Sequence, residues 1–119
     1  MKKGTINILG TDYKISVCTE EERPKFGDNN GMAELYNREL VVRVGYEDDP
    51  EVFDNVEAFK HKVLRHECFH AIFHEAGHAD YCEDEKLVNA LAVMWPKIKR
   101  IMEAADSMDL EANHEKVCV

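Results

Sequence analysis

Apolar and polar residues alternate along the first 44 residues of the chain, as they do in half-buried β-strands. β-branched residues are frequent in these stretches, and polar turns separate them. The pattern predicts four strands, at Thr5–Leu9, Tyr13–Thr19, Met32–Tyr36 and Glu39–Val44. We expect turns at 10–12 and 37–38, with a polar loop over 20–31 between the two pairs of strands.

In the second half of the chain, apolar residues recur every three or four positions, which is the spacing of one helical face. The first stripe predicts a helix from about Glu51 to Gly77, because glycine commonly caps the C-terminal end of a helix. The acids at 83–85 suit the N-terminus of a second helix, which runs to about Ala105 and is kinked or interrupted at Pro96. The fold class is therefore α+β, with a small antiparallel-rich sheet followed by two long helices.

The chain has 119 residues, of which 45% are hydrophobic, and this indicates a single domain over residues 1–119. Residues 106–119 are mostly polar, and we expect this tail to fray. A net charge of −9 argues against nucleic-acid binding, which requires a basic surface. No stretch resembles a signal peptide or approaches the roughly 18 apolar residues of a membrane span. Because the four cysteines show no disulfide or metal-site spacing, we expect a cytoplasmic protein with reduced thiols. No feature indicates an oligomeric state.

The pattern His-Glu-x-x-His occurs twice, as HECFH at 66–70 and as HEAGH at 74–78. On a helix, two histidines four residues apart share one face and bind one Zn2+, and the glutamate serves as the general base of a metalloprotease. The first copy lies in the middle of the predicted helix, whereas a glycine interrupts the second where the helix should end. We therefore assign His66 and His70 as metal ligands and Glu67 as the catalytic base.

A third protein ligand is needed. His74 does not provide it, because it lies about 12 Å from His66 along a straight helix. Two kinds of candidate remain. One is an acid at the start of the next helix: Glu83, Asp84 or Glu85. The other is His78, just after the glycine cap. The acids are favoured, because the position of His78 does not match the spacing in zinc proteases that use three histidines.

These residues resemble the ImmA/IrrE family of zinc metallopeptidases, especially its short phage-encoded members. That family has HExxH followed, on the next helix, by E-x-x-A-N-x-F-A, which is similar to EKLVNALA at 85–92 of this chain. Val88 and Leu91 replace the alanine and the phenylalanine of the family motif. The resemblance covers residues 1–105 and is most specific over 63–98. It implies a minimal, gluzincin-like zincin fold in which Glu85 is the third zinc ligand.

The resemblance implies a zinc-dependent metallo-endopeptidase of a bacterial or phage-infected cell, with a protein or peptide substrate. Bound zinc lowers the pKa of a water molecule towards about 7, and Glu67 takes its proton and passes it to the leaving amine. An edge strand, for which 39–44 is the candidate, is expected to hold the substrate by strand addition. The candidates for stabilising the transition state are His74, His78 and Tyr81.

Two other functions fit the same residues. One is a zinc-bound binding module that engages a regulator without cleaving it. The other is a zinc hydrolase of a non-peptide substrate such as RNA, which the negative charge disfavours.

Overall fold

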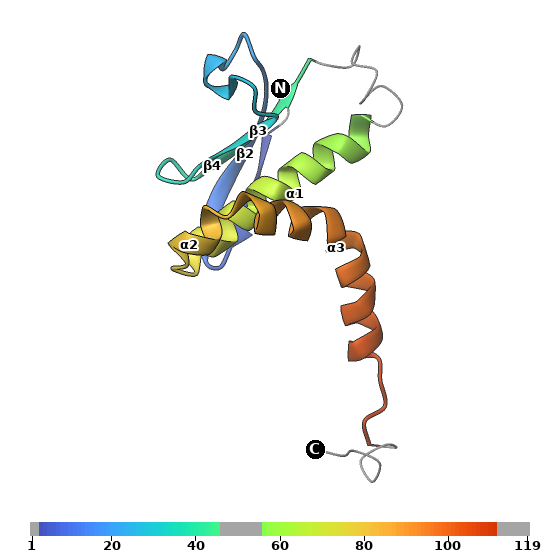
Figure 1. The fold of residues 1–119 in the computed structure, drawn as a ribbon. Coiled ribbons are helices and arrows are strands. Elements are labelled where there is room, and N and C mark those ends of the chain that lie inside the picture. Colours follow the sequence, from blue (N-terminus) through green and yellow to red (C-terminus); the bar gives the residue numbers. More distant parts are fainter. Residues whose placement is uncertain (1–2, 46–55, 112–119) are drawn as a thin grey trace.

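The structure is a computed structural model that describes residues 3–45 and 56–111. Four strands come first, followed by the helices (Figure 1): β1 (Lys3–Ile8), β2 (Thr11–Thr19), the short 3-10 helix η1 (Pro24–Phe26), β3 (Gly31–Glu34), β4 (Glu39–Val44), α1 (Val56–Glu75), α2 (Ala79–Cys82) and α3 (Glu85–Asp106). This order confirms the α+β class. The predicted start of the first helix at 51–55 and the end of the predicted tail, 112–119, lie outside the described residues.

The strand order in the sheet is β1-β2-β4-β3, in which β1 and β2, and likewise β3 and β4, are antiparallel, whereas β2 and β4 are parallel. β4 therefore lies inside the sheet, and the expectation that residues 39–44 form an edge strand is wrong. Leu40, Val41 and Val42 are 0%, 0% and 3% exposed, so successive residues are buried on both faces of β4. Such a continuous apolar run is typical of a central strand. The edge strand on this side is β3.

The turn between β1 and β2 comes earlier than its predicted position at 10–12. It consists of Leu9 and Gly10, with φ angles of 51° and 96°. A two-residue hairpin turn with positive φ at both positions matches the twist of the two strands it connects. The Asn7 side chain supports the turn by accepting a hydrogen bond from the Gly10 N–H (3.0 Å) and donating one to Asp12 (2.8 Å).

Different parts of the chain cover the two faces of the sheet. α1 covers one face, where Tyr13, Leu40 and Ala71 are fully buried. The loop that contains η1 covers the other face, where Phe26 is fully buried against Cys18 and Val41. The polar composition of this loop did not predict a core residue within it.

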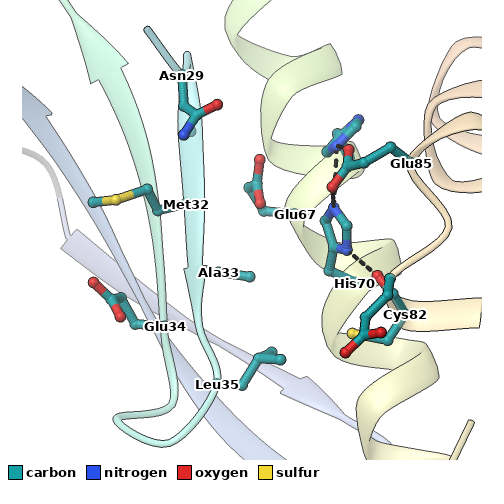
Figure 2. Close-up of a pocket in the computed structure, with 12 residues that line it drawn as sticks. Asn29, Met32, Ala33, Glu34, Leu35, Glu67, His70, Cys82 and Glu85 are labelled. Carbon is teal, nitrogen blue, oxygen red and sulfur yellow. Dashed lines mark hydrogen bonds and ion pairs between the residues drawn. The ribbon is translucent and has the colours of Figure 1, made fainter. Parts of the chain in front are cut away.

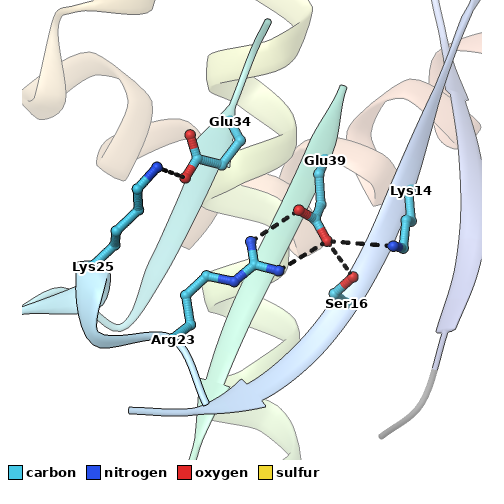
Figure 3. Close-up of polar contacts among 6 residues, drawn as sticks. All are labelled: Lys14, Ser16, Arg23, Lys25, Glu34 and Glu39. Carbon is cyan, nitrogen blue, oxygen red and sulfur yellow. Dashed lines mark hydrogen bonds and ion pairs between the residues drawn. The ribbon is translucent and has the colours of Figure 1, made fainter. Parts of the chain in front are cut away.

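Glu39, at the start of β4, ties this loop to the sheet (Figure 3). Its carboxylate accepts two hydrogen bonds from Arg23 (2.9 and 3.3 Å) and one from the Ser16 hydroxyl (2.6 Å). The bonds from Arg23 are the main reason why the pKa of Glu39 is below its ordinary value. These contacts hold the loop that leads directly into β3.

α1 and α3 are joined by a contact at the proline of α3. Pro96 has no N–H, so the carbonyl of Ala92, four residues earlier, loses its usual helical partner. The Arg65 Nε donates a hydrogen bond to that carbonyl at 3.0 Å. α3 therefore continues through the proline without interruption, and Figure 1 shows it bending near its middle. Within the described residues, no helix has the length and apolar character needed to cross a membrane.

Candidate metal centre

The helix that carries HECFH ends where its sequence predicts. Gly77 has a φ angle of 81°, its N–H donates to the carbonyl of His74 (3.1 Å), and the next N–H, of His78, donates to the carbonyl of Phe73 (2.8 Å). This pair of bonds is the Schellman motif, which ends a helix with a left-handed residue. The HEAGH copy is therefore split by a helix terminus, so its two histidines do not share one helical face. HECFH lies within α1.

The acids at the start of α3 have separate roles. Asp84 is the N-cap residue, and its carboxylate accepts a hydrogen bond from the Leu87 N–H at 3.0 Å. This is the usual contact of an N-terminal aspartate cap. Glu85 is the first residue of the helix, and its carboxylate turns towards the two histidines of HECFH (Figure 2).

His66, His70 and Glu85 form a group that can hold a metal ion, with one ligand atom of each within 4.8 Å of the others. The Glu85 carboxylate lies 3.1 Å from His66 Nε2 and 3.0 Å from His70 Nε2, and the two nitrogens are 3.2 Å apart. Two atoms that each lie about 2.0–2.1 Å from a tetrahedral zinc ion are about 3.3 Å apart. The spacing of these three side chains therefore fits a zinc ion between them.

Both histidines have a second contact that orients the ring. The Nδ1 of His70 donates to the backbone carbonyl of Cys82, which leaves its Nε2 lone pair directed at the other ligands. His66 has a side-chain hydrogen bond to Asn89, one turn after Glu85 in α3. Burial, followed by the nearby His70, lowers the pKa of His66, although Glu85 and Asn89 oppose this shift. The lowered pKa favours the neutral ring, which is the form that binds metal ions.

Glu67 lies beside this group but does not join it. It is 7% exposed, and among the described residues its carboxylate has no hydrogen bond or ion pair. Burial, and secondarily the charge of Glu85, raises the pKa of Glu67 to about 8 in the metal-free protein. A buried carboxyl without a partner is costly, so one is kept where a function requires it. Here the carboxyl faces a cleft.

The cleft has a volume of about 520 Å³ and lies between β3 and the helices (Figure 2). It is lined by β3 and its flanks, by the metal group and Glu67, and by the end of α2: Asn29, Gly31, Met32, Ala33, Glu34, Leu35, His66, Glu67, His70, Cys82, Glu83 and Glu85. Glu83 thus lies at the cleft but outside the metal group. Asn29, which sequence reasoning missed, presents an amide to the cleft.

The three candidates for stabilising a transition state do not line the cleft. His74 is exposed in the last turn of α1. His78 is the N-cap residue of α2, and its ring lies 5.1 Å from that of Tyr81. His78 is also absent from the metal group, which in the described part of the chain consists of His66, His70 and Glu85. Asn89 was missed as well, although it lies four residues after Glu85 and so on the same helical face.

Comparisons with protein-family models, with curated proteins and with solved structures find no match for this chain. Membership of the ImmA/IrrE family therefore stays a prediction that rests on the sequence motifs.

Proposed function

We propose that this protein is a zinc-dependent metallo-endopeptidase with a minimal zincin-like fold, similar to the ImmA/IrrE metallopeptidases. The observation that carries the proposal is the position of Glu67. Its buried carboxyl has no hydrogen-bond partner among the residues that the structure describes, and it lies in the same cleft as a group of two histidines and a glutamate with zinc-like spacing. A purely structural metal site does not require such a carboxyl, whereas hydrolysis requires a base beside the metal.

In this proposal His66, His70 and Glu85 hold the zinc ion. When bound, the ion polarises a substrate carbonyl and lowers the pKa of a water molecule. Glu67 accepts the proton of the attacking water and delivers it to the leaving amine. Both steps require a carboxyl group close to the attacking water, and Glu67 is a buried carboxyl that lines the cleft beside the three candidate ligands.

The edge position of β3 supports a peptide as the substrate. Among the described residues β3 is paired on one side only, with β4, and its residues line the cleft opposite the metal group. The backbone groups on its outer side are free to pair with an extended peptide by strand addition. A peptide bound in this way would run along the cleft, with its carbonyl groups near Glu67.

The test compares the native chain with Glu67→Gln and with the matched control Glu83→Gln, which removes a carboxylate at the cleft but outside the metal group. Zinc content is measured after dialysis. Cleavage of a mixture of unstructured peptides is followed by mass spectrometry in water enriched in heavy oxygen, because hydrolysis places a solvent oxygen in the new carboxylate. We expect all three chains to hold one zinc ion. Glu67→Gln should cleave at least about 100-fold more slowly, and the control should remain active.

Three other outcomes would contradict the proposal in different ways. A native chain that holds zinc but cleaves nothing would be a zinc-bound binding module. A Glu67→Gln variant as active as the native chain would refute the role of the glutamate as base. A native chain that binds no zinc would refute the metal centre itself.

A further inference from the structure

A smaller recess of about 240 Å³ opens beside the metal group, at the end of the cleft that Asn29 marks in Figure 2. It shares His66, Glu67 and Glu85 with the cleft and extends from them towards the start of α1. Its other walls include Asp28, Asn29, Asn30, Phe59, Lys62 and Asn89. Sites for whole small molecules typically measure roughly 300–1,000 Å³, so this recess suits one part of a larger substrate.

Lys62 brings a positive charge into the recess. It lies four residues before His66, so the two side chains are on the same face of α1. The Lys62 side chain is half-buried, and its ammonium lies 5.7 Å from the centre of the Phe59 ring. Among the described residues this ammonium has no hydrogen bond or ion pair, whereas Lys60 is paired with Glu57 at 2.7 Å. An ammonium that is partly removed from water and has no anionic partner attracts an anionic ligand.

The other polar groups of the recess leave this charge uncancelled. Three side-chain amides, which supply neutral N–H donors, line it: Asn29, Asn30 and Asn89. Asp28 lines it too, but this side chain is exposed and forms no ion pair with Lys62, so solvent screens its charge. Glu67 and Glu85 lie at the metal group, where a bound divalent ion offsets their charges.

We propose that the recess binds a carboxylate of the substrate peptide, with Lys62 as the charged anchor. This inference rests on the proposed peptidase function, because it names the class of peptide that the same cleft takes. An ammonium and amide N–H groups donate the hydrogen bonds that a carboxylate accepts. The carboxylate belongs either to an aspartate or glutamate side chain or to the C-terminus of the peptide, and the test separates these two sources.

The position of Lys62 sets where the carboxylate lies relative to the scissile bond. Four residues of helix separate its Cα from that of His66 by about 6 Å. Helical side chains lean towards the N-terminus, and the contact with Phe59 carries the ammonium further from the metal group. An extended peptide advances about 3.3 Å per residue, so the carboxylate belongs about two to four residues from the scissile bond. It lies on one side of that bond, because the recess opens at one end of the cleft.

The test uses the zinc-loaded native chain and pools of ten-residue peptides, blocked at both ends and randomised among neutral residues. One pool carries a glutamate at a fixed position, and a matched pool carries glutamine there. A third is the glutamine pool with a free C-terminal carboxylate. Mass spectrometry of the fragments gives the rate and the position of each cleavage.

We expect one source of the carboxylate to accelerate cleavage at least about tenfold over the blocked glutamine pool. If the source is a side chain, the advantage falls on peptides whose glutamate lies about two to four residues from the cleaved bond, on one side only. If the source is the C-terminus, the third pool has the advantage, and cleavage occurs the same few residues from the free end.

Two variants test the residue itself. Lys62→Met keeps the length of the side chain but removes its charge, and the ratio of the two rates should fall to within about twofold of unity. Lys60→Met removes the same charge from a lysine that borders a different cavity, and it should keep the native ratio. A ratio of rates does not depend on how much of a variant is folded. The same pools are also bound to zinc-loaded Glu67→Gln, with and without Lys62→Met, which makes the comparison without cleavage.

The outcomes separate this inference from the proposed function. Equal cleavage of all three pools refutes the carboxylate anchor but not the peptidase, and so does a preference that Lys62→Met retains. If no pool is cleaved but Glu67→Gln retains the carboxylate-bearing peptides through Lys62, the peptidase proposal fails and the anchor is supported. A chain that neither cleaves nor retains any pool refutes both.

Discussion

Gly31 is the position at which the structure makes its sharpest prediction. A Cβ atom at this position would lie 2.7 Å from Val63 Cγ1, 2.9 Å from Glu67 Oε2 and 3.1 Å from the carbonyl oxygen of Val41. Two of these distances are below 3.0 Å, which real Cβ atoms essentially never show, and the third atom belongs to the backbone of the central strand. Gly31→Ala must therefore displace β3, the side chains of α1, or both.

The expected cost follows from this crowding. Adding one methyl group to a tightly packed site typically destabilises a protein by about 1–3 kcal/mol. We expect a loss of this size in the free energy of unfolding, measured by urea denaturation. The Glu67 carboxylate must also move, so peptide cleavage should fall by more than the loss of folded protein explains. Zinc affinity should change little, since none of the three metal ligands is among the close neighbours of the new Cβ.

Two variants sharpen the comparison. Gly4→Ala is the matched control, because a Cβ at this position in β1 meets nothing within 4 Å and its cost should stay within about 0.5 kcal/mol. Val63→Ala removes the nearest atom, so Gly31→Ala should cost less in that background than in the native chain. A Gly31→Ala protein with native stability and native activity would refute the argument that Gly31 makes room for Glu67, the proposed general base.

Three further predictions concern separate parts of the molecule. Arg65→Ala should lower the free energy of unfolding by about 1–3 kcal/mol in urea denaturation, because it leaves the buried carbonyl of Ala92 without a partner. In a Pro96→Ala background the alanine N–H can donate to that carbonyl, so a smaller loss there would confirm this cause. Hydrogen bonds from Tyr13 (2.6 Å) and from a threonine hydroxyl lower the pKa of Glu75 below 4.5. The contribution of Glu75 to the stability of the fold is thus present above pH 4.5 and is lost as the pH falls through its lowered pKa. The melting temperatures of the native chain and of Glu75→Gln should therefore converge in acid. A difference that stays constant with pH would contradict this. Asn89→Ala removes the second contact of His66, a proposed zinc ligand, and should weaken zinc affinity about 10-fold to 100-fold in a chelator competition assay. Unchanged affinity would show that the contact does not orient the ring.

The parts of the fold that the sequence predicted are those that depend on local chemistry. The 3,4 spacing identified both helices, and Gly77 marked the end of α1 because a left-handed cap needs only its own few residues. The choice of HECFH over HEAGH followed directly from that cap. The strand segments were also close to their observed bounds, because alternation is a local pattern.

The order of the strands could not be predicted in the same way. β2 and β4 pair in parallel across the intervening loop and β3, and no local pattern specifies which strands meet at such a distance. One signal was present, since the run Leu40–Val42 is apolar at three successive positions, which is typical of a strand buried on both faces. Phe26 illustrates the opposite limit, because a single aromatic residue in a polar loop carries no periodicity that would reveal its burial.

The glycine that splits HEAGH also helps to build the site at HECFH. Because the Schellman motif at Gly77 ends α1, the chain can turn back through α2, which brings the Cys82 carbonyl to the ring of His70. Asp84 then caps α3 and thereby sets its first residue, Glu85, where its carboxylate meets both histidines. Each of these steps is a local backbone preference, and together they place a glutamate distant in sequence within about 3 Å of two helical histidines. The position of Glu85, the proposed third ligand, is thus determined by the capping of the helices on either side of the turn. This explains why Glu85 faces the histidines while the neighbouring Asp84 binds the backbone of α3.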